Sequence, residues 1–258
     1  MINRIHEVNR KRWDVGSERW AKRADFRGFW RRCPSEPELV LSEKELEYLA
    51  DVRGKHVAVL GSGDNQVAFA LAGLGGIVTS IDISQNQLDV AECRAQELGL
   101  AISFLRADVT ELVSLDSSTF DIVYTGGHVA VWVSNIDDYY AEASRILRPD
   151  GLLIIAEYHP FRRIWKDSPA QLVLECSYFE RGPFEYDVSE DILQAQPGTL
   201  KSYEFHWTIS DYLNAVLKAG FRVVETDEFG EDAADWEGAP LQGLPEFILV
   251  IARKDIDT

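Results

Sequence analysis

Cysteine is scarce in this sequence. The 258 residues include three cysteines, Cys33, Cys93 and Cys176, and no two of them form a CxxC pair. Such spacing argues against a disulfide framework and against a cysteine-based metal site. The five histidines are equally scattered, without an HExxH or HxH pattern, so we expect no bound metal. Both features favour a reducing compartment, and the sequence predicts a cytoplasmic protein.

Long hydrophobic runs are also missing, so we expect no contact with a membrane. The first residues, "MINRIHEVNRKRWDVG", are polar and lack the apolar core of a secretory signal. Hydrophobic residues make up 46% of the chain and charged residues 27%, which is ordinary for a globular protein. A chain of this length is near the upper end of one α/β domain, and we expect one domain with an insertion.

Basic residues are fewer than acidic ones, and the net charge is −17. Nucleic acid phosphates therefore have little reason to approach the surface as a whole. Residues 1–32 are the exception, with ten Lys/Arg against four Asp/Glu. They can be interpreted as an amphipathic helix docked on an acidic body or as a partner-binding arm, and charge patterning favours the first.

The hydrophobic pattern changes period along the chain. Residues 3–23 and 42–52 have helical spacing, and Ser42 has the position of an N-cap. Beyond them, strands are expected at residues 56–60, 76–82, 101–108, 120–127 and 151–158. Helices are expected between them at residues 66–74, 84–99 and 135–148. This alternation predicts an α/β fold, a doubly wound and mostly parallel sheet covered on both faces.

The alternation stops after Tyr158 for about 45 residues, and loops of this length are usually lids or binding elements. A helix and a strand follow at residues 208–230, and the chain closes with another strand, "PEFILVIARK". We therefore expect a single domain, residues 1–258. Its expected parts are an N-terminal helical cap (1–54), a cofactor-binding core (55–157), a lid-like insertion (158–206) and a C-terminal helix and strand pair (207–258).

Residues suited to ligand binding follow each predicted strand, where open parallel sheets bind their ligands. They are Gly61 to Asn65, Asp82, Asp108, Gly126-Gly127-His128 and Tyr158-His159. Gly61 and Gly63 let the backbone approach a ligand, and the helix after them offers free N–H groups to an anion. Asp82 can accept hydrogen bonds from ribose hydroxyls. Together these positions indicate a nucleotide-like ligand.

The glycine pattern does not match a dinucleotide site. A dinucleotide fingerprint has a third glycine five residues after the first, where this chain has Gln66. NAD is therefore poorly matched. A ligand with a ribose and a small anionic end, but no diphosphate, is matched better.

The segments "VAVLGSGDN", "VTSIDIS", "LRADVTEL", "FDIVYTGG" and "ILRPDGLLIIAE" resemble the successive motifs of class I S-adenosylmethionine-dependent methyltransferases, within the type 11 group. The close match covers about residues 56–157, and a looser one covers 203–253. The resemblance implies a seven-stranded Rossmann-like sheet whose last strand is antiparallel, with N-terminal helices over the cofactor. It also implies S-adenosylmethionine as cofactor and S-adenosylhomocysteine as product.

The resemblance assigns cofactor contacts to individual residues. Gly61, Ser62, Gly63, Asp64 and Asn65, with Gly126 and Gly127, match segments beside the methionine part, whereas Asp82, Ile83, Gln87, Asp108 and Val109 match those beside the ribose and adenine. Two positions depart from the family pattern. Val59 replaces a common acid, and Asn65 replaces a common glycine, although asparagine tolerates left-handed backbone well. Arg31 and Trp20 are candidates for the missing polar contacts.

Methyl transfer is an in-line displacement that chiefly requires a positioned acceptor, and a general base is optional. His128 and His159 follow strands four and five, where a base would stand, although a lone histidine is more often structural. Trp132, Tyr158 and Trp207 could line the acceptor pocket or belong to an aromatic core beneath the lid.

The acceptor is expected to be a small molecule enclosed by the insertion. The segment "YTGGH" stands where DNA amino-methyltransferases have an Asn/Asp-Pro-Pro-aromatic motif, and no Pro-Cys pair is present for attack on cytosine. Two alternatives stay open. One is a non-catalytic S-adenosylmethionine-binding protein on the same fold. The other is a nicotinamide-dependent oxidoreductase, against which Gln66 argues.

Overall fold

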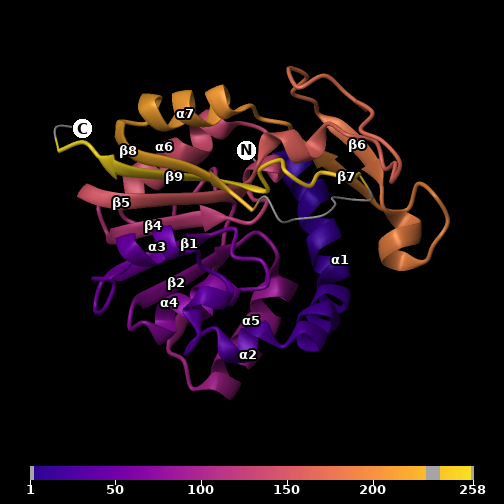
Figure 1. The fold of residues 1–258 in the computed structure, drawn as a ribbon. Helices are drawn as coiled ribbons and strands as arrows, with labels where there is room; N and C mark the ends of the chain where they lie inside the picture. The colour runs from indigo at the N-terminus through magenta and orange to yellow at the C-terminus, as the bar shows by residue number, and fades with distance from the viewer. Residues whose placement is uncertain (1–2, 231–238, 257–258) are drawn as a thin grey trace.

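The structure is a computed structural model that describes residues 3–230 and 239–256. Within them lies a seven-stranded sheet with the order β3-β2-β1-β4-β5-β9-β8 (Figure 1). Its strands are β1 (His56–Leu60), β2 (Ile77–Asp82), β3 (Ile102–Arg106), β4 (Phe120–Gly126), β5 (Leu147–Tyr158), β8 (Phe221–Phe229) and β9 (Phe247–Lys254). Strand β9 runs antiparallel to β5 and β8, and the other pairs are parallel. The predicted fold class is confirmed.

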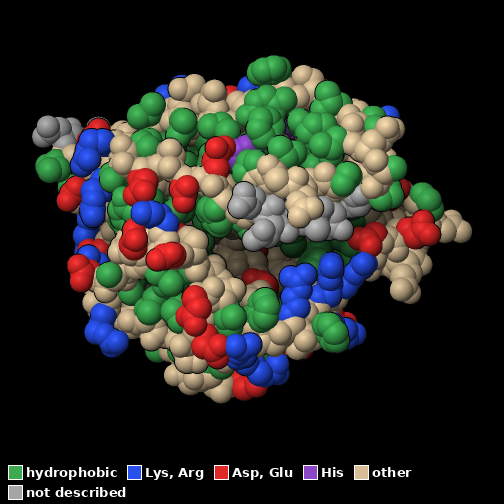
Figure 2. Space-filling model, viewed as in Figure 1, with side chains coloured by type: hydrophobic (Ala, Val, Ile, Leu, Met, Phe, Trp, Pro, Cys, Tyr) green, Lys and Arg blue, Asp and Glu red, His purple; other side chains and the backbone are tan. Residues whose placement is uncertain are grey.

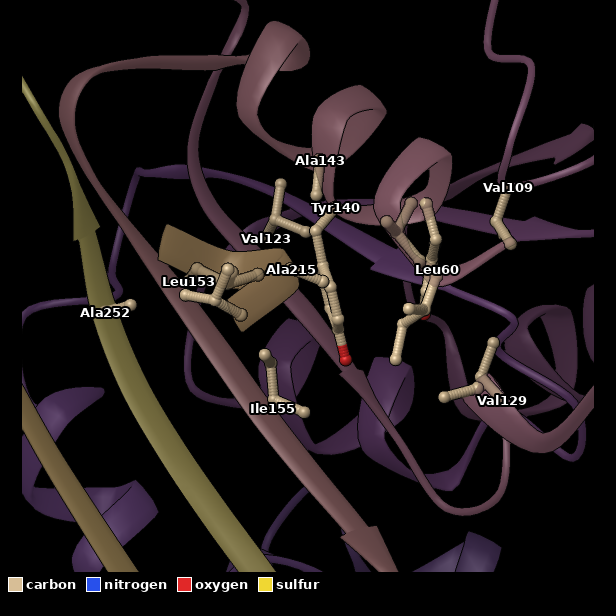
Figure 3. Close-up of a cluster of buried hydrophobic side chains, with 14 of the residues drawn as sticks. Leu60, Val109, Val123, Val129, Tyr140, Ala143, Leu153, Ile155, Ala215 and Ala252 are labelled. Atoms are coloured by element: carbon tan, nitrogen blue, oxygen red, sulfur yellow. The ribbon is translucent and has the colours of Figure 1, made fainter. Parts of the chain in front are cut away.

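Helices cover both faces of the sheet. One face packs against α2 (Phe29–Arg32), α3 (Glu43–Tyr48), α4 (Gln66–Gly73) and α5 (Gln85–Leu98), with the 3-10 turn η1 (Pro37–Leu39) beside them. The other packs against α6 (Ile136–Ile146) and α7 (Ile209–Lys218). Alternate side chains of each strand point to opposite faces. In Figure 3, Tyr140 and Ala143 of α6 and Ala215 of α7 lie over Val123 and Leu153.

Local capping sets the helix starts. Ser42 and Glu45 form a reciprocal capping box at α3. The Ser84 side chain accepts from the Gln87 N–H, so α5 starts three residues beyond the end of β2. The helix expected to reach residue 148 ends instead at Ile146. Leu147 already pairs with Phe120 of β4, and a register shift between Phe120 and Ile122 accommodates residues 148–151 in the first part of β5.

Helix α1 (Arg4–Arg27) lies across the carboxyl ends of the central strands (Figure 1). It begins at the N-cap Asn3 and ends at Gly28, which has a left-handed φ of 71°. Near its C-terminus, Arg94 of α5 donates to the Ala21 carbonyl oxygen at 2.9 Å and to Asp25 at 2.9 Å. The basic segment therefore packs on the body of the protein, as the first of its two interpretations predicts.

The insertion contains an antiparallel hairpin of β6 (Phe184–Asp187) and β7 (Lys201–Glu204). A 3-10 turn, η3 (Pro160–Arg163), precedes the hairpin, and a π-helical turn, η4 (Ser189–Leu193), connects its strands. Asn9 of α1 accepts from the Tyr203 N–H at 2.8 Å and donates to the Tyr203 carbonyl oxygen at 2.9 Å. The insertion and α1 are thus joined beside the strand ends (Figure 1).

None of the helices within residues 3–230 and 239–256 combines the length and the apolar character that a membrane span requires.

Replacing Leu153 by alanine should lower the free energy of unfolding by about 2–5 kcal/mol, because its side chain is fully buried in the cluster of Figure 3. Val113→Ala is the matched control, since Val113 is 83% exposed, and its cost should stay within about 0.5 kcal/mol. Urea denaturation of both variants measures the difference. Equal losses in the two variants would contradict this account of the core.

Candidate functional site

The turn after β1 adopts left-handed backbone at three residues, Gly61, Gly63 and Asn65, with φ angles of 62°, 50° and 64°. A Cβ on Gly61 would lie 2.5 Å from the side chain of Val129, so glycine is required there. Asn65 donates from Nδ2 to the Gly63 carbonyl oxygen at 2.8 Å. It thus adopts the conformation that a glycine commonly supplies at this position.

Asp82, at the end of β2, is 7% exposed and accepts two backbone hydrogen bonds. The Gly63 N–H donates to Oδ2 at 2.9 Å, and the Ser84 N–H donates to Oδ1 at 2.8 Å. Burial raises the pKa of Asp82, and these two N–H groups act in the opposite direction. Each carboxylate oxygen keeps a further lone pair, which suits a pair of neighbouring hydroxyl groups on a ligand.

Asp108 follows β3 and binds His6 of helix α1. His6 Nδ1 lies 2.6 Å from Asp108 Oδ2, and the Ser134 N–H donates to His6 Nε2 at 2.9 Å. Because Nε2 accepts, Nδ1 carries the proton and donates to the carboxylate. Burial raises the pKa of Asp108, but the hydrogen bonds from His6 and Thr110 outweigh it and hold the pKa below its usual value.

These residues surround one pocket at the carboxyl ends of the strands, visible as a hollow in Figure 2. Its empty space amounts to about 650 Å³, including space open to solvent. Its walls are formed by His6, Asn9 and Trp13 of α1, by Gly61, Gly63, Asp82, Ile83, Asp108, Val109, Gly127 and His128 after the strands, and by Val129, Trp132 and Val133 at or beside η2 (Ala130–Trp132).

His128 has left-handed backbone with a φ of 86°, which is rare for a residue other than glycine and often marks a functional site. The buried carboxylate of Glu157 holds this turn by accepting from the N–H groups of His128 at 2.9 Å, Val129 at 3.2 Å and Ala130 at 3.1 Å. Burial raises the pKa of Glu157 to about 7, although the three donors lower it. Glu157 therefore positions the His128 turn.

The His128 ring lies between a tyrosine and an arginine of the insertion. Its centroid is 4.0 Å from that of Tyr158, and Arg163 Nη2 lies 3.1 Å from its ring nitrogens. Burial, followed by the charges of Arg163 and Arg12, lowers the pKa of His128 well below its usual value. The imidazole is therefore neutral at physiological pH and available to accept a proton.

Other predicted cofactor residues support the pocket without lining it. Ser62 shares a 2.7 Å hydrogen bond with Ser80, Gln87 is 5% exposed beneath the N-cap of α5, and Asp64 accepts from the Gln66 N–H. Gly126 packs so closely on β5 that a Cβ would lie 2.2 Å from the Ala156 carbonyl oxygen. These residues shape the turns that carry the pocket-lining residues.

Two of the predicted chemical residues lie elsewhere. His159 is fully buried, with Nε2 2.7 Å from Glu228 of β8 and Nδ1 accepting from the Phe161 N–H. Trp207 donates from Nε1 to the Ala130 carbonyl oxygen at 3.0 Å and packs against the hydrophobic cluster. Neither residue lines the pocket, and the contacts of both side chains are those of residues that stabilise the fold.

The two side chains suggested for the missing polar contacts are also outside the pocket lining. Arg31 pairs with Glu97 at 3.4 Å on the surface, because α2 turns away from the strand ends. Trp20 lies on α1 beside Trp13, with ring centroids 4.6 Å apart. Val59, where the family commonly has an acid, is 3% exposed and packs in the core.

The α1 residues of the pocket are the ones that the sequence did not reveal. His6, Asn9 and Trp13 follow each other at intervals of three and four residues and therefore share one face of the helix. This spacing is the feature of the sequence that could have identified these three residues as one face of the pocket.

The pocket fits S-adenosylmethionine on two structural observations. A Cβ on Gly127 would meet nothing within 4 Å, and one on Gly63 would meet only the Gly61 carbonyl oxygen, at 3.9 Å. The absence of side chains there leaves room for a ligand against the backbone. Asp82 offers its remaining lone pairs to ribose hydroxyls, as described above.

Comparison with known proteins gives the same family. A family model described as a methyltransferase domain matches residues 58–155. A ubiquinone biosynthesis O-methyltransferase of Bartonella bacilliformis is 25% identical over 158 residues, which are 59% of this chain and 62% of that protein. An uncharacterized methyltransferase of Bacillus subtilis, YbaJ, is 26% identical over 182 residues, 69% of each chain. The chain thus spans less than two thirds of the length of the Bartonella enzyme.

Among solved structures, an S-adenosylmethionine-dependent methyltransferase from Mesorhizobium loti has the same fold. Its TM-score is 0.61 at 24% identity, and the alignment covers 81% of this chain and 94% of the other. The seven-stranded, mostly parallel sheet with flanking helices matches this neighbour. Residues 58–155 thus match a methyltransferase domain, and the chain has the fold of S-adenosylmethionine-dependent methyltransferases of solved structure.

Proposed function

We propose that the protein transfers the methyl group of S-adenosylmethionine to a small-molecule acceptor in the pocket beneath α1. The observation that carries this proposal is the convergence of the Gly61–Asn65 turn, Asp82 and Asp108 on one pocket that also contains a neutral histidine. The net charge of −17 argues against a nucleic acid acceptor. Methyltransferase names among the relatives support the reaction class.

Each pocket residue has a role in this proposal. Asp82 would bind the ribose hydroxyls, Asp108 with Ile83 and Val109 would border the adenine, and the backbone of Gly63 and Gly127 would run beside the methionine part. The bound cofactor supplies an electrophilic methyl group. The indole of Trp132, which lines the pocket, would face its positive charge.

His128 is the proposed general base. Its neutral ring can accept the proton of an acceptor hydroxyl or ammonium group, and Arg163 together with Tyr158 would hold its orientation. The Glu157 carboxylate would act as a positioning group, because it holds the turn that presents the ring. His159 has no part in the proposal, since its ring is committed to Glu228 and the Phe161 N–H.

The test of the proposed function is calorimetric titration with S-adenosylmethionine, S-adenosylhomocysteine and NAD, followed by a screen of small acceptors with a labelled methyl group. Binding of the first two ligands without NAD, together with label transfer, is the expected result. Cofactor binding without transfer to any acceptor would favour the non-catalytic binding protein. Binding of NAD alone would contradict the proposal.

Asp82→Ala should weaken S-adenosylmethionine binding roughly 100-fold, because two hydrogen bonds to the ribose, each contributing about 1.5 kcal/mol, are lost. Asp89→Ala on exposed α5 surface is the matched control and should bind as the wild type does. Calorimetry measures both affinities, and thermal denaturation confirms that both variants fold. Unchanged affinity in Asp82→Ala would refute the ribose assignment.

The His128 ring should stay neutral at pH values where an ordinary histidine is already protonated, because burial and the two arginine charges lower its pKa. Arg163→Met removes one of these causes and should move the titration of His128 to higher pH. NMR spectra of the five isotope-labelled histidines, with His128→Gln to assign the signal, measure this titration. A His128 ring that protonates near neutral pH would contradict this account of the charges around the ring.

A further inference from the structure

The guanidinium group of Arg12 lies among three indole rings of α1 and η2. Its Cζ atom is 4.5 Å from the ring centroid of Trp13, 5.3 Å from that of Trp20 and 4.4 Å from that of Trp132. Trp13 and Trp132 line the pocket, and Arg12 packs against both of their rings without lining the pocket itself. In Figure 2, Lys and Arg side chains gather over α1 along one side of the hollow.

Several buried donors beside the pocket have no acceptor among the residues that the structure describes. Among these residues, nothing accepts a hydrogen bond from Arg12 Nε, Arg12 Nη1 or Trp132 Nε1. The part of the chain that the structure describes offers Arg12 no carboxylate within ion-pair distance. All three atoms carry N–H groups, so the complementary ligand group is an acceptor.

The nearest carboxylates are engaged by other cations. Glu204 exerts the largest attraction on Arg12, but its Oε2 accepts from Arg163 Nη1 at 2.6 Å and lies 3.9 Å from His206 Nε2. Asp191 pairs with Arg19 at 2.8 Å on the surface. Within residues 3–230 and 239–256, Arg12 is therefore left without a direct counter-charge.

Burying a guanidinium without an acceptor is unfavourable, and burial lowers the pKa of Arg12 to about 10. Indole faces attract the cation, but they do not accept its in-plane N–H bonds. A local feature that opposes stability is commonly retained where a ligand compensates for it. The planar fork of arginine matches a carboxylate or a phosphate, because two parallel N–H bonds can form.

We infer that the acceptor carries an oxyanionic group, a carboxylate or a phosphate, which binds to the Arg12 fork and to Trp132 Nε1. The inference rests on the proposed function, because that proposal makes this pocket the acceptor site. Trp132 is four residues beyond His128 on the turn that Glu157 holds, so the anionic group and the proposed base share one wall of the pocket. A small anionic nucleophile is thus favoured over a neutral or cationic acceptor.

The experiment uses the full chain saturated with S-adenosylhomocysteine, whose own carboxylate then occupies the cofactor site. Thermal denaturation is followed in sodium phosphate, in sodium benzoate and in sodium chloride of matched ionic strength. At least one of the two oxyanions should raise the melting temperature above its value in chloride, because a ligand that binds the folded state stabilises it. Phosphate and benzoate distinguish a phosphorylated acceptor from a carboxylic acid.

Arg12→Met should abolish this oxyanion-specific rise. Lys11→Gln removes one exposed positive charge from the same helix and should keep the full rise. Arg12→Lys retains the positive charge but lacks the two parallel N–H groups, so the oxyanions should raise its melting temperature less than that of the wild type. This variant keeps the test decisive where Arg12→Met fails to fold.

Three results would overturn the inference. The first is that neither oxyanion raises the melting temperature of the wild type above its value in chloride. The second is an equal rise in Arg12→Met, and the third is a rise in the ligand-free chain that disappears on saturation with S-adenosylhomocysteine. The last would assign Arg12 to the carboxylate of the cofactor. Calorimetry of the same protein with S-adenosylhomocysteine separates the two proposals. If calorimetry shows no cofactor binding, the proposed function is refuted. The oxyanion titration of the ligand-free chain still tests the Arg12 site in that case.

Discussion

The docking of helix α1 depends on polar contacts spaced along one of its faces. His6 binds Asp108 after β3, Asn9 pairs with the backbone of the insertion, and Asp14 accepts from the Ser84 hydroxyl at 2.7 Å. These contacts hold an otherwise basic helix over strand ends that contribute two carboxylates. Without them the glycine turn and the acids would form an open edge, and the pocket would lose the wall that contains Trp13 and Arg12.

The parts of this arrangement that the sequence predicts are local ones. Left-handed backbone at Gly61 and Gly63 follows from glycine itself, and the start of α5 follows from the Ser84 cap. The positions of Asp82 and Asp108 follow from a rule of parallel sheets, because residues after neighbouring strands meet at the same edge. The fold class and the strand-end pocket therefore needed no knowledge of distant contacts.

The remaining parts depend on tertiary packing that periodicity does not encode. Asn9 meets Tyr203 across almost two hundred residues, and the Arg12 environment requires Trp132 from the turn after β4. His159 follows a strand as His128 does, yet β8 contributes Glu228 to it and η3 bends it away from the pocket. His128 and His159 each follow a strand in the sequence, and only the groups that pack beside each ring in the fold distinguish their roles.

Because α1 is one continuous helix, its position affects how ligands enter and leave the pocket. His6 and Arg12 are six residues apart, about 9 Å along the helix axis, so one unbroken helix borders both the proposed adenine end and the oxyanion position. A straight helix that swings away from Asp108 also withdraws Arg12 from Trp132. One helix would thus form part of both proposed binding positions, so a movement of α1 that opens one of them would also open the other.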